Sequence, residues 1–497
     1  MNKTNQKLKS VMFVGTGSDV GKSVVNAAFC RIFLQDGFRP APYKAQNMSL
    51  NSYATPEGLE IGRAQAVQAE ACSIDCLVDM NPVLLKPTNE VSSQVVVLGK
   101  PVGNQSAKEY FRANDNKVLF DTAYEAFCRL EKQYNPIVLE GAGSISELNL
   151  KYRDITNMRM ALRTGASVYL IADIDRGGVF ASVYGTIALL DEAERAQVKG
   201  IIINKFRGDI ALFEDGKNKL EELTGKPVVG VLPYYHDIYI EEEDSVMLNT
   251  KSQNAMAGKI NVAVVLLGKM ANFTDFNRLE LDSRVHLFYT NNTAEIEKAD
   301  IVILPGSKNT ISDLQEIRMN GVAKAIMAAS KAGKTVIGIC GGYQMMGQRL
   351  SDPQGIEGNV KEVPGLGLLP VITEIEDEKV TEQCIFKFKN YPDDCKGYEI
   401  HMGRTKAVEF ENGLNRLSSD KTDGYFLNEK CWGSYIHGIL DNQVVIDDLL
   451  GQIAKETDKI DWDAFKQQQY DKLAAHVRKH SDMNAIYKEL IVEEETC

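Results

Sequence analysis

One cysteine in the run VIGICGGYQMMG, residues 336–347, has the surroundings of a catalytic nucleophile. The apolar residues before Cys340 predict a buried strand, and the amphipathic segment after Gly341 and Gly342 predicts a helix. Cys340 would then stand at a helix N-terminus, where the helix dipole favours thiolate over thiol. The two glycines allow a tight turn and the approach of a substrate carbonyl. We interpret Cys340 as a nucleophile; the alternative is a buried structural cysteine.

A nucleophilic cysteine needs a base, and the chain contains six histidines. His437 is the one in an apolar, strand-like run that ends at glycine, WGSYIHGIL at residues 432–440. Alone, such a histidine would be interpreted as a hydrogen-bonded core residue. Together with Cys340 in one domain, it is our candidate for the base.

A second centre lies near the N-terminus. Residues 11–15 (VMFVG) predict a buried strand, and residues 24–35 predict a helix. The turn between them, TGSDVGKS, is interpreted as a phosphate loop that binds ATP through its backbone N–H groups, although Thr16 stands where the standard pattern has glycine. Its lysine would neutralise phosphate charge and its serine hydroxyl would hold Mg²⁺. The candidate ATP-binding residues are Thr16, Gly17, Ser18, Asp19, Val20, Gly21, Lys22 and Ser23.

Polar residues also follow other predicted strands of this half. Glu140 ends the strand PIVLE and is our second magnesium candidate beside Ser23, because carboxylates at strand C-termini meet at the ligand edge of an open α/β sheet. Asn204 follows the strand at 200–203 and is predicted to contact the nucleotide base. Asp175 and Arg176 follow the strand at 167–172 and are candidates for magnesium or substrate contacts; the alternative is a helix cap with a solvated arginine.

Composition limits the class of protein. The 497 residues are too many for one core, so two or three domains are expected. A net charge of −12 argues against nonspecific nucleic-acid binding. The nine cysteines show no metal-binding or disulfide pattern, no apolar run is long enough to span a membrane, and residues 1–10 show no signal-peptide core. A cytoplasmic location is therefore predicted.

Strand and helix patterns alternate from residue 11 to 232, which predicts a doubly wound, mostly parallel sheet in an α/β domain. The acidic, polar stretch at 234–259 marks a boundary, and a second α/β pattern follows. We predict an ATP-binding domain at 1–240, a linker at 241–258, a second α/β domain at 259–445, and a helical C-terminal tail at 446–497 with two or three surface helices.

The second domain resembles class I, triad-type glutamine amidotransferases. The resemblance rests on GICGGYQMMG, on GSYIHG about a hundred residues later, and on LPGSKNT at residues 304–310. It implies that Cys340 and His437 release ammonia from glutamine, and that backbone near Gly306 and Gly341 forms the oxyanion hole. Most such enzymes have a glutamate two positions after the histidine, where this chain has Ile439. The residue that orients His437 is therefore unassigned.

The first domain resembles dethiobiotin synthetase and related ligases, which activate a carboxylate with ATP. The loop spacing GTxxxVGKS and the motif EGAG carry this resemblance. It implies that Lys44 reaches the transferring phosphate; the alternative is a residue of a polar surface loop. Residues 62–72 (GRAQAVQAEAC) predict a helix to which we assign no chemistry.

Ten motifs in order along nearly the whole chain, among them QNMSLNS, NPVLLKP, DIDRGGVFA and GYEIHMGR, resemble those of cobyric acid synthases. The resemblance implies a role for Glu399 and His401 near an active site, against the alternative of a hydrogen-bonded strand pair. It also places Lys86 near phosphate or substrate carboxylate, which the residues alone leave open.

The implied reaction is ATP-, Mg²⁺- and glutamine-dependent amidation of the b, d, e and g carboxylates of adenosylcobyrinic acid a,c-diamide. An acyl phosphate makes chemical sense, because a bare carboxylate repels nucleophiles and has no usable leaving group. The alternatives are cobyrinic acid a,c-diamide synthase or a related amidotransferase ligase, and a partitioning-type nucleotide-switch ATPase. The corrinoid contacts, the ammonia route and the oligomeric state cannot be predicted from the sequence.

Overall fold

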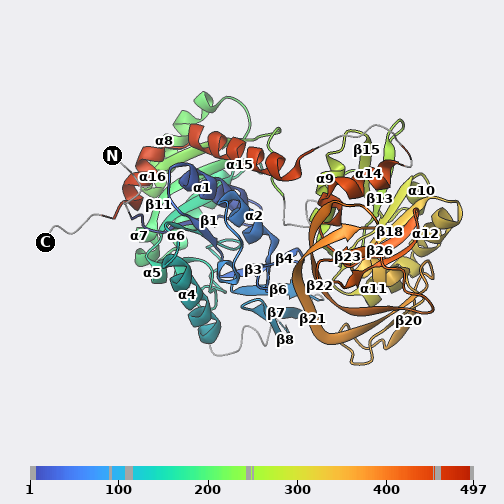
Figure 1. Cartoon of the computed structure of the whole chain (residues 1–497). Helices are drawn as coiled ribbons and strands as arrows, with labels where there is room; N and C mark the ends of the chain where they lie inside the picture. Colours follow the sequence, from blue (N-terminus) through green and yellow to red (C-terminus); the bar gives the residue numbers. More distant parts are fainter. Residues whose placement is uncertain are drawn as a thin grey trace.

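The computed structural model describes residues 7–88, 92–106, 116–241, 248, 251–451, 453 and 460–492. Two α/β lobes lie side by side, and strands from both meet between them (Figure 1). The predicted linker falls partly outside the described residues. Over the part of the chain that is described, no helix is long and apolar enough to cross a membrane.

A six-stranded sheet forms the centre of the N-terminal lobe, and every pairing in it is parallel, as predicted. Met12 and Val14 of its central strand belong to one hydrophobic core, whereas Val11 and Phe13 belong to another. Alternate residues of a strand point to opposite faces, so both faces of this sheet are covered. In spatial order the strands are β12 (Val228–Pro233), β11 (Val198–Phe206), β10 (Ser167–Asp173), β1 (Val11–Gly15), β9 (Ile137–Glu140) and β2 (Ala41–Tyr43).

Helices between these strands cover the sheet. They are α1 (Lys22–Gln35), α2 (Arg63–Ala71), α4 (Lys117–Glu131), α5 (Met158–Thr164), α6 (Val179–Leu189), α7 (Glu192–Gln197) and α8 (Glu214–Thr224). Two small sheets extend this lobe towards the other. One contains β3 (Gln46–Met48), β6 (Val83–Pro87), β7 (Ser92–Val97) and β8 (Lys100–Ser106), and the other contains β4 (Ser52–Ala54) and β5 (Glu60–Gly62).

The C-terminal lobe has its own sheet, which is parallel except for one antiparallel edge pair. Its order is β15 (Val285–Thr290), β13 (Ile260–Val265), β16 (Ile301–Leu304), β18 (Thr335–Ile339), β26 (Cys431–Ser434) and β25 (Tyr425–Asn428). Helices α9 (Asn277–Glu280), α10 (Thr293–Ile296), α11 (Thr310–Met319), α12 (Val322–Lys331), α13 (Gly341–Met346) and α14 (Gln443–Gly451) accompany it.

A second, largely antiparallel sheet of this lobe is built on a long hairpin, β21 (Val371–Phe388) with β22 (Asp394–Ala407). Figure 1 shows this hairpin on the side that faces the N-terminal lobe. The remaining strands are β19 (Arg349–Ser351), β20 (Glu362–Pro364), β23 (Asn415–Leu417) and β24 (Thr422–Asp423), with β14 (Met270–Ala271) and β17 (Gly306–Ser307) as a separate pair.

The C-terminal helices α15 (Trp462–Lys479) and α16 (Met483–Leu490) return to the N-terminal lobe, where α15 lies beside α1 (Figure 1). They are more than the surface helices that the sequence predicts, because Tyr470, Leu473 and Val477 are buried in one of the two cores of that lobe. An ion pair of 2.7 Å between Arg31 and Asp471 adds a polar contact. The N-terminal lobe is thus completed by the end of the chain.

Candidate active sites

Cys340 lies between β18 and α13, as the sequence predicts. Its backbone has φ 49° and ψ −109°, a strained conformation that projects the side chain from a sharp turn. Cys340 is 7 % exposed, and its Sγ lies 3.6 Å from the carbonyl oxygen of Ile400. This is the arrangement of a nucleophile held at the end of a buried strand.

His437 follows strand β26 and is buried beside Cys340. Its Nδ1 lies 2.7 Å from Oδ2 of Asp275, and the other oxygen of that carboxylate accepts a hydrogen bond of 3.0 Å from the backbone N–H of Gly438. The side chains of His437 and Asp275 are each only 2 % exposed. Asp275 is thus the orienting residue that the sequence left unassigned, and Ile439 takes no part.

The charges of this triad reinforce one another. Burial lowers the pKa of His437, but the Asp275 carboxylate and the Cys340 side chain raise it more strongly, to about 10. The geometry therefore favours a protonated His437, which can give its proton to a departing amine.

The two glycines proposed for the oxyanion hole, Gly306 in β17 and Gly341 at the start of α13, lie in segments that approach each other closely. An ideal Cβ on Gly341 would stand 2.8 Å from the backbone nitrogen of Ser307, and one on Gly306 would stand 3.3 Å from Cε1 of His437. The structure therefore brings both segments to Cys340. The role of their N–H groups stays a prediction.

A cavity of about 390 Å³ opens on Cys340 and His437 and has walls from both lobes. Its lining includes four lysines, Lys86, Lys269, Lys308 and Lys379. Lys86 comes from β6 of the N-terminal lobe and bonds Glu60 at 2.6 Å and Ser52 at 2.8 Å. Lys86 therefore lies in the wall of the Cys340 cavity, paired with a buried carboxylate.

His401 also lines this cavity, and Glu399 lies beneath it on the same strand. The His401 ring stacks on Tyr435 with centroids 3.8 Å apart, and its Nδ1 lies 2.9 Å from the carbonyl oxygen of Gly403. Glu399 stands 3.8 Å from His401 Nε2. His401 thus lines the cavity together with Cys340, whereas Glu399 is not one of the residues that line it.

The phosphate loop, residues 16–23, connects β1 to α1 as predicted. The ammonium of Lys22 donates hydrogen bonds to the carbonyl oxygens of Gly17 at 2.8 Å and Gly143 at 3.0 Å. Burial and the neighbouring Lys44 lower the pKa of Lys22 to about 8, while Glu140 and Asp19 oppose this shift. The Lys22 ammonium therefore lies over its own loop, where it can bind an anion such as phosphate.

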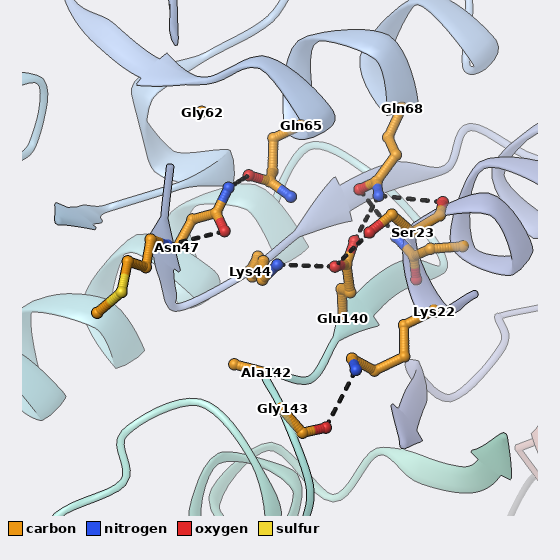
Figure 2. Close-up of polar contacts among 12 residues, drawn as sticks. Lys22, Ser23, Lys44, Asn47, Gly62, Gln65, Gln68, Glu140, Ala142 and Gly143 are labelled. Atoms are coloured by element: carbon orange, nitrogen blue, oxygen red, sulfur yellow. Dashed lines mark hydrogen bonds and ion pairs between the residues drawn. The ribbon is translucent and has the colours of Figure 1, made fainter. Parts of the chain in front are cut away.

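Glu140 is the centre of a buried polar cluster beside the phosphate loop (Figure 2). Its carboxylate accepts hydrogen bonds from Ser23 Oγ at 2.8 Å, Lys44 Nζ at 2.8 Å and Gln68 Nε2 at 2.6 Å. Burial raises the pKa of Glu140, but Lys44 and these hydrogen bonds hold it below its usual value. The carboxylate is therefore kept ionised where a phosphate-bound cation would lie.

The donors at this site fit magnesium. Mg²⁺ prefers oxygen ligands, takes few from the protein, and completes its shell with phosphate and water. The Ser23 hydroxyl and the Glu140 carboxylate supply two such oxygens side by side. Among the described residues there is no group of three or more His, Cys, Asp or Glu that could hold a metal ion, so an all-protein metal cage is not part of the described structure.

Three further candidates lie around the phosphate loop. Asn204 Nδ2 donates a hydrogen bond of 2.9 Å to the carbonyl oxygen of Val20, so it supports the loop directly. Arg176 stands 3.3 Å from the carboxylate of Asp19. Asp175 pairs instead with Arg207 at 2.6 Å on the surface. The structure thus brings Asn204 and Arg176 to the loop and turns Asp175 towards Arg207.

Two known protein families match the two lobes of the chain. A family described as "CobQ/CobB/MinD/ParA nucleotide binding domain" matches residues 11–246, and one described as "CobB/CobQ-like glutamine amidotransferase domain" matches residues 261–445. The chain is 65 % identical to the cobyric acid synthase of Parabacteroides distasonis over 98 % of this chain and 99 % of the relative. The chain belongs to the cobyric acid synthase family.

Relatives in the same family include the cobyric acid synthase of Bacteroides fragilis, 61 % identical over 97 % of this chain and 99 % of the relative. That of Syntrophobacter fumaroxidans is 46 % identical over 97 % of this chain and 98 % of the relative. The predicted α/β architecture with a nucleotide-binding half and a glutamine amidotransferase half is therefore confirmed for this member of the cobyric acid synthase family.

Sequence reasoning missed two residues of these sites in this cobyric acid synthase family member. Asp275 lies in a segment, ANFTDF, that carries no motif, and it meets His437 across 162 positions. Gln68 lies in the helix to which no chemistry was assigned, yet it bonds Glu140. Two glutamines three residues apart on an alanine-rich helix were the available signal, since polar side chains among small ones indicate a buried polar face.

Proposed function

We propose that this chain amidates the b, d, e and g side-chain carboxylates of adenosylcobyrinic acid a,c-diamide, with glutamine as the nitrogen source and Mg²⁺–ATP as the activating reagent. The proposal is supported above all by the presence in one chain of a Cys340–His437–Asp275 triad and a phosphate loop with Glu140, in a member of the cobyric acid synthase family. Glutamine, ATP and the corrinoid polycarboxylate are the substrates of this proposal.

In the first half-reaction, the Cys340 thiolate attacks the side-chain carbonyl carbon of glutamine. Backbone N–H groups near Gly341 and Gly306 hold the oxyanion, and His437 gives its proton to the nitrogen as the C–N bond breaks. Water, deprotonated by His437, then cleaves the thioester to glutamate and free Cys340. Asp275 keeps the imidazole in the orientation that both proton transfers need.

In the second half-reaction, a substrate carboxylate takes the γ-phosphoryl group of ATP and becomes an acyl phosphate, with ADP as the leaving group. The ammonium groups of Lys22 and Lys44 face the phosphate site and offset negative charge there. Ser23 and Glu140 would hold Mg²⁺, which neutralises phosphate charge when bound. Ammonia then attacks the acyl carbon, and inorganic phosphate departs.

The cavity at Cys340 suits the first substrate electrostatically. Glutamine carries an α-carboxylate, and the cavity wall holds Lys86, Lys269, Lys308 and Lys379. Glu60 offsets part of this positive charge by pairing with both Lys86 and Lys379, and burial together with these two lysines lowers the pKa of Lys308 to about 7. We infer that the remaining lysines favour the carboxylate end of glutamine.

The test is mass spectrometry of adenosylcobyrinic acid a,c-diamide after incubation with the protein, Mg²⁺–ATP and amide-¹⁵N glutamine. Four labelled amides per corrinoid, with one ADP formed per amide, are expected. Glutamine hydrolysis with an unchanged corrinoid would overturn the proposed acceptor. Labelling of cobyrinic acid at positions a and c instead would support a diamide synthase, and ATP hydrolysis without any acceptor would support a nucleotide switch.

Two variants separate the half-reactions. Cys340→Ala should lose glutamine-dependent amidation and keep amidation with added ammonium chloride, whereas Lys22→Ala should lose both. Cys384→Ala is the matched control, because Cys384 is a buried cysteine of the same lobe on strand β21, outside the set of residues that line the cavity. Amidation with glutamine by Cys340→Ala would contradict the assignment of the nucleophile.

A further inference from the structure

A short segment of the N-terminal lobe is bonded directly to the turn that carries Asp275. The backbone N–H of Ser52 donates a hydrogen bond of 3.0 Å to Asn272 Oδ1, and the backbone N–H of Phe273 donates one of 3.1 Å to Asn51 Oδ1. Each asparagine side chain thus accepts a backbone hydrogen bond from the residue that follows the other asparagine, and both bonds cross between the lobes. Both asparagines are buried, at 2 % and 3 % exposure, so water cannot easily replace these bonds.

In the C-terminal lobe, these hydrogen bonds hold the turn that carries Asp275, the residue that orients His437. Asn272 has φ 53°, a left-handed conformation, and its carbonyl oxygen accepts a hydrogen bond of 3.1 Å from the N–H of Asp275. Asn272 therefore begins the single turn that aims the Asp275 carboxylate at His437 Nδ1. A shift of Asn272 would move the carboxylate with it, because only two residues separate them.

The same segment also contacts Tyr398, the aromatic residue that lies against the His437 ring. Tyr53, next to Ser52, packs on Tyr398 with ring centroids 4.5 Å apart. Tyr398 in turn stacks on the His437 ring at 5.4 Å and exchanges backbone hydrogen bonds with His437. The stretch from Asn51 to Tyr53 therefore contacts both the turn that carries Asp275 and the Tyr398 ring that flanks His437.

On the other side, this segment is connected to the phosphate site. The carbonyl oxygen of Asn51 accepts a hydrogen bond of 3.1 Å from the N–H of Arg63, the first residue of α2. Gln68, further along α2, bonds Glu140, and Lys44, seven residues before Asn51, bonds the same carboxylate (Figure 2). Two short paths thus run from Glu140 to Asn51.

We propose that Asn51 and Asn272 are positioning residues that make the Asp275–His437 geometry depend on the state of the nucleotide site. This inference rests on the proposed roles of Cys340, His437 and Glu140. When Mg²⁺–ATP binds next to Glu140, the hydrogen bonds of the Glu140 carboxylate to Gln68 and Lys44 change. The hydrogen bonds of Asn51 and Asn272 between the lobes then transmit this change to the position of Asp275. Glutamine is then hydrolysed efficiently only when the carboxylate can be activated, so little ammonia is wasted.

The experiment measures glutamine hydrolysis by the full chain, with and without Mg²⁺–ATP and adenosylcobyrinic acid a,c-diamide, in Asn51→Ala and Asn272→Gly. Glycine is chosen at 272 because it accepts the left-handed φ while removing the oxygen. In both variants, the rate of glutamine hydrolysis with Mg²⁺–ATP and corrinoid, divided by the rate without them, should fall to within about two-fold of one. The kcat/KM for glutamine should fall about ten-fold. Amidation from ammonium chloride should be unchanged.

The matched control is Gln383→Ala, which removes a different hydrogen bond between the lobes, that of Gln383 Nε2 to the carbonyl oxygen of Ala54 at 2.9 Å. It should keep the stimulation by nucleotide, and Asn51→Asp, which retains the acceptor oxygen, should recover it. Normal stimulation in both Asn51→Ala and Asn272→Gly would overturn the proposal, as would an equal loss of ammonium-dependent amidation. Glutamine hydrolysis by Cys340→Ala would instead overturn the proposed function.

Discussion

Replacing Asp275 with asparagine tests the triad with the least change in shape. The carboxylate now meets His437 Nδ1 at 2.7 Å and the N–H of Gly438 at 3.0 Å, and the amide of asparagine has nearly the same size. The substitution removes the negative charge that stabilises the imidazolium. It also lets the amide NH₂ face Nδ1, which favours the wrong tautomer of the imidazole.

The pKa of His437 sets the expected magnitude. A rise from 6.5 to about 10 corresponds to about 5 kcal/mol in favour of the imidazolium, at about 1.36 kcal/mol per pH unit. Asp275 makes the largest of the contributions that raise this pKa. If it supplies roughly half of the total, about 2 to 3 kcal/mol is lost, and kcat/KM for glutamine should fall on the order of 30- to 100-fold.

The assay compares kcat/KM for glutamine with the rate of amidation from ammonium chloride, which does not use His437. Asp275→Asn should lower the first and leave the second within about two-fold. Asp282→Asn is the matched control, because Asp282 is another buried carboxylate of this lobe and pairs with Arg284 at 2.6 Å. Unchanged glutamine kinetics in Asp275→Asn, at unchanged thermal stability, would refute the reasoning.

Further predictions concern pH, nucleotide binding and packing. Because the pKa of His437 is raised in the folded protein, its imidazolium stabilises the fold fully below about pH 6.5. Both this stabilisation and glutamine hydrolysis should decline as the pH rises through about 10, which unfolding and rate measurements across the pH range would detect. The pKa of Lys22 is lowered to about 8, and a bound phosphate should raise it. ATP binding at about pH 9 should therefore be accompanied by proton uptake, measured by calorimetry in two buffers, and Lys22→Met should abolish this uptake. Gln68→Ala should raise the KM for Mg²⁺–ATP several-fold without changing the KM for ammonium, because it removes the hydrogen bond that orients the Glu140 carboxylate at the phosphate site. An unchanged KM for Mg²⁺–ATP would contradict this role. Gly342→Ala should lower the thermal midpoint and abolish glutamine hydrolysis, because its Cβ would stand 1.9 Å from the carbonyl oxygen of Leu304; a stable, active variant would show that this contact can relax.

Local patterns in the sequence were enough for the strands, the phosphate loop and the nucleophile. The strand before Cys340 and the glycines after it are adjacent in the chain, so a short window contains the whole turn. The same holds for β1, the loop and α1, since backbone N–H groups of consecutive residues form the phosphate site. Parallel pairing of the first sheet followed from the alternation of strand and helix.

Only the tertiary structure decided which distant side chains meet at these sites. Asp275 reaches His437 because β13 and β26 belong to the same sheet, a pairing that no local pattern encodes. Gln68 reaches Glu140 only because α2 packs against α1 over the sheet, and the C-terminal helices complete a core that begins at Leu8. The sequence by itself determined the reactive groups, Cys340 and Lys22 among them, because their chemistry is local. The partners that orient them depend on packing across long stretches of chain, and this packing is what the fold decides.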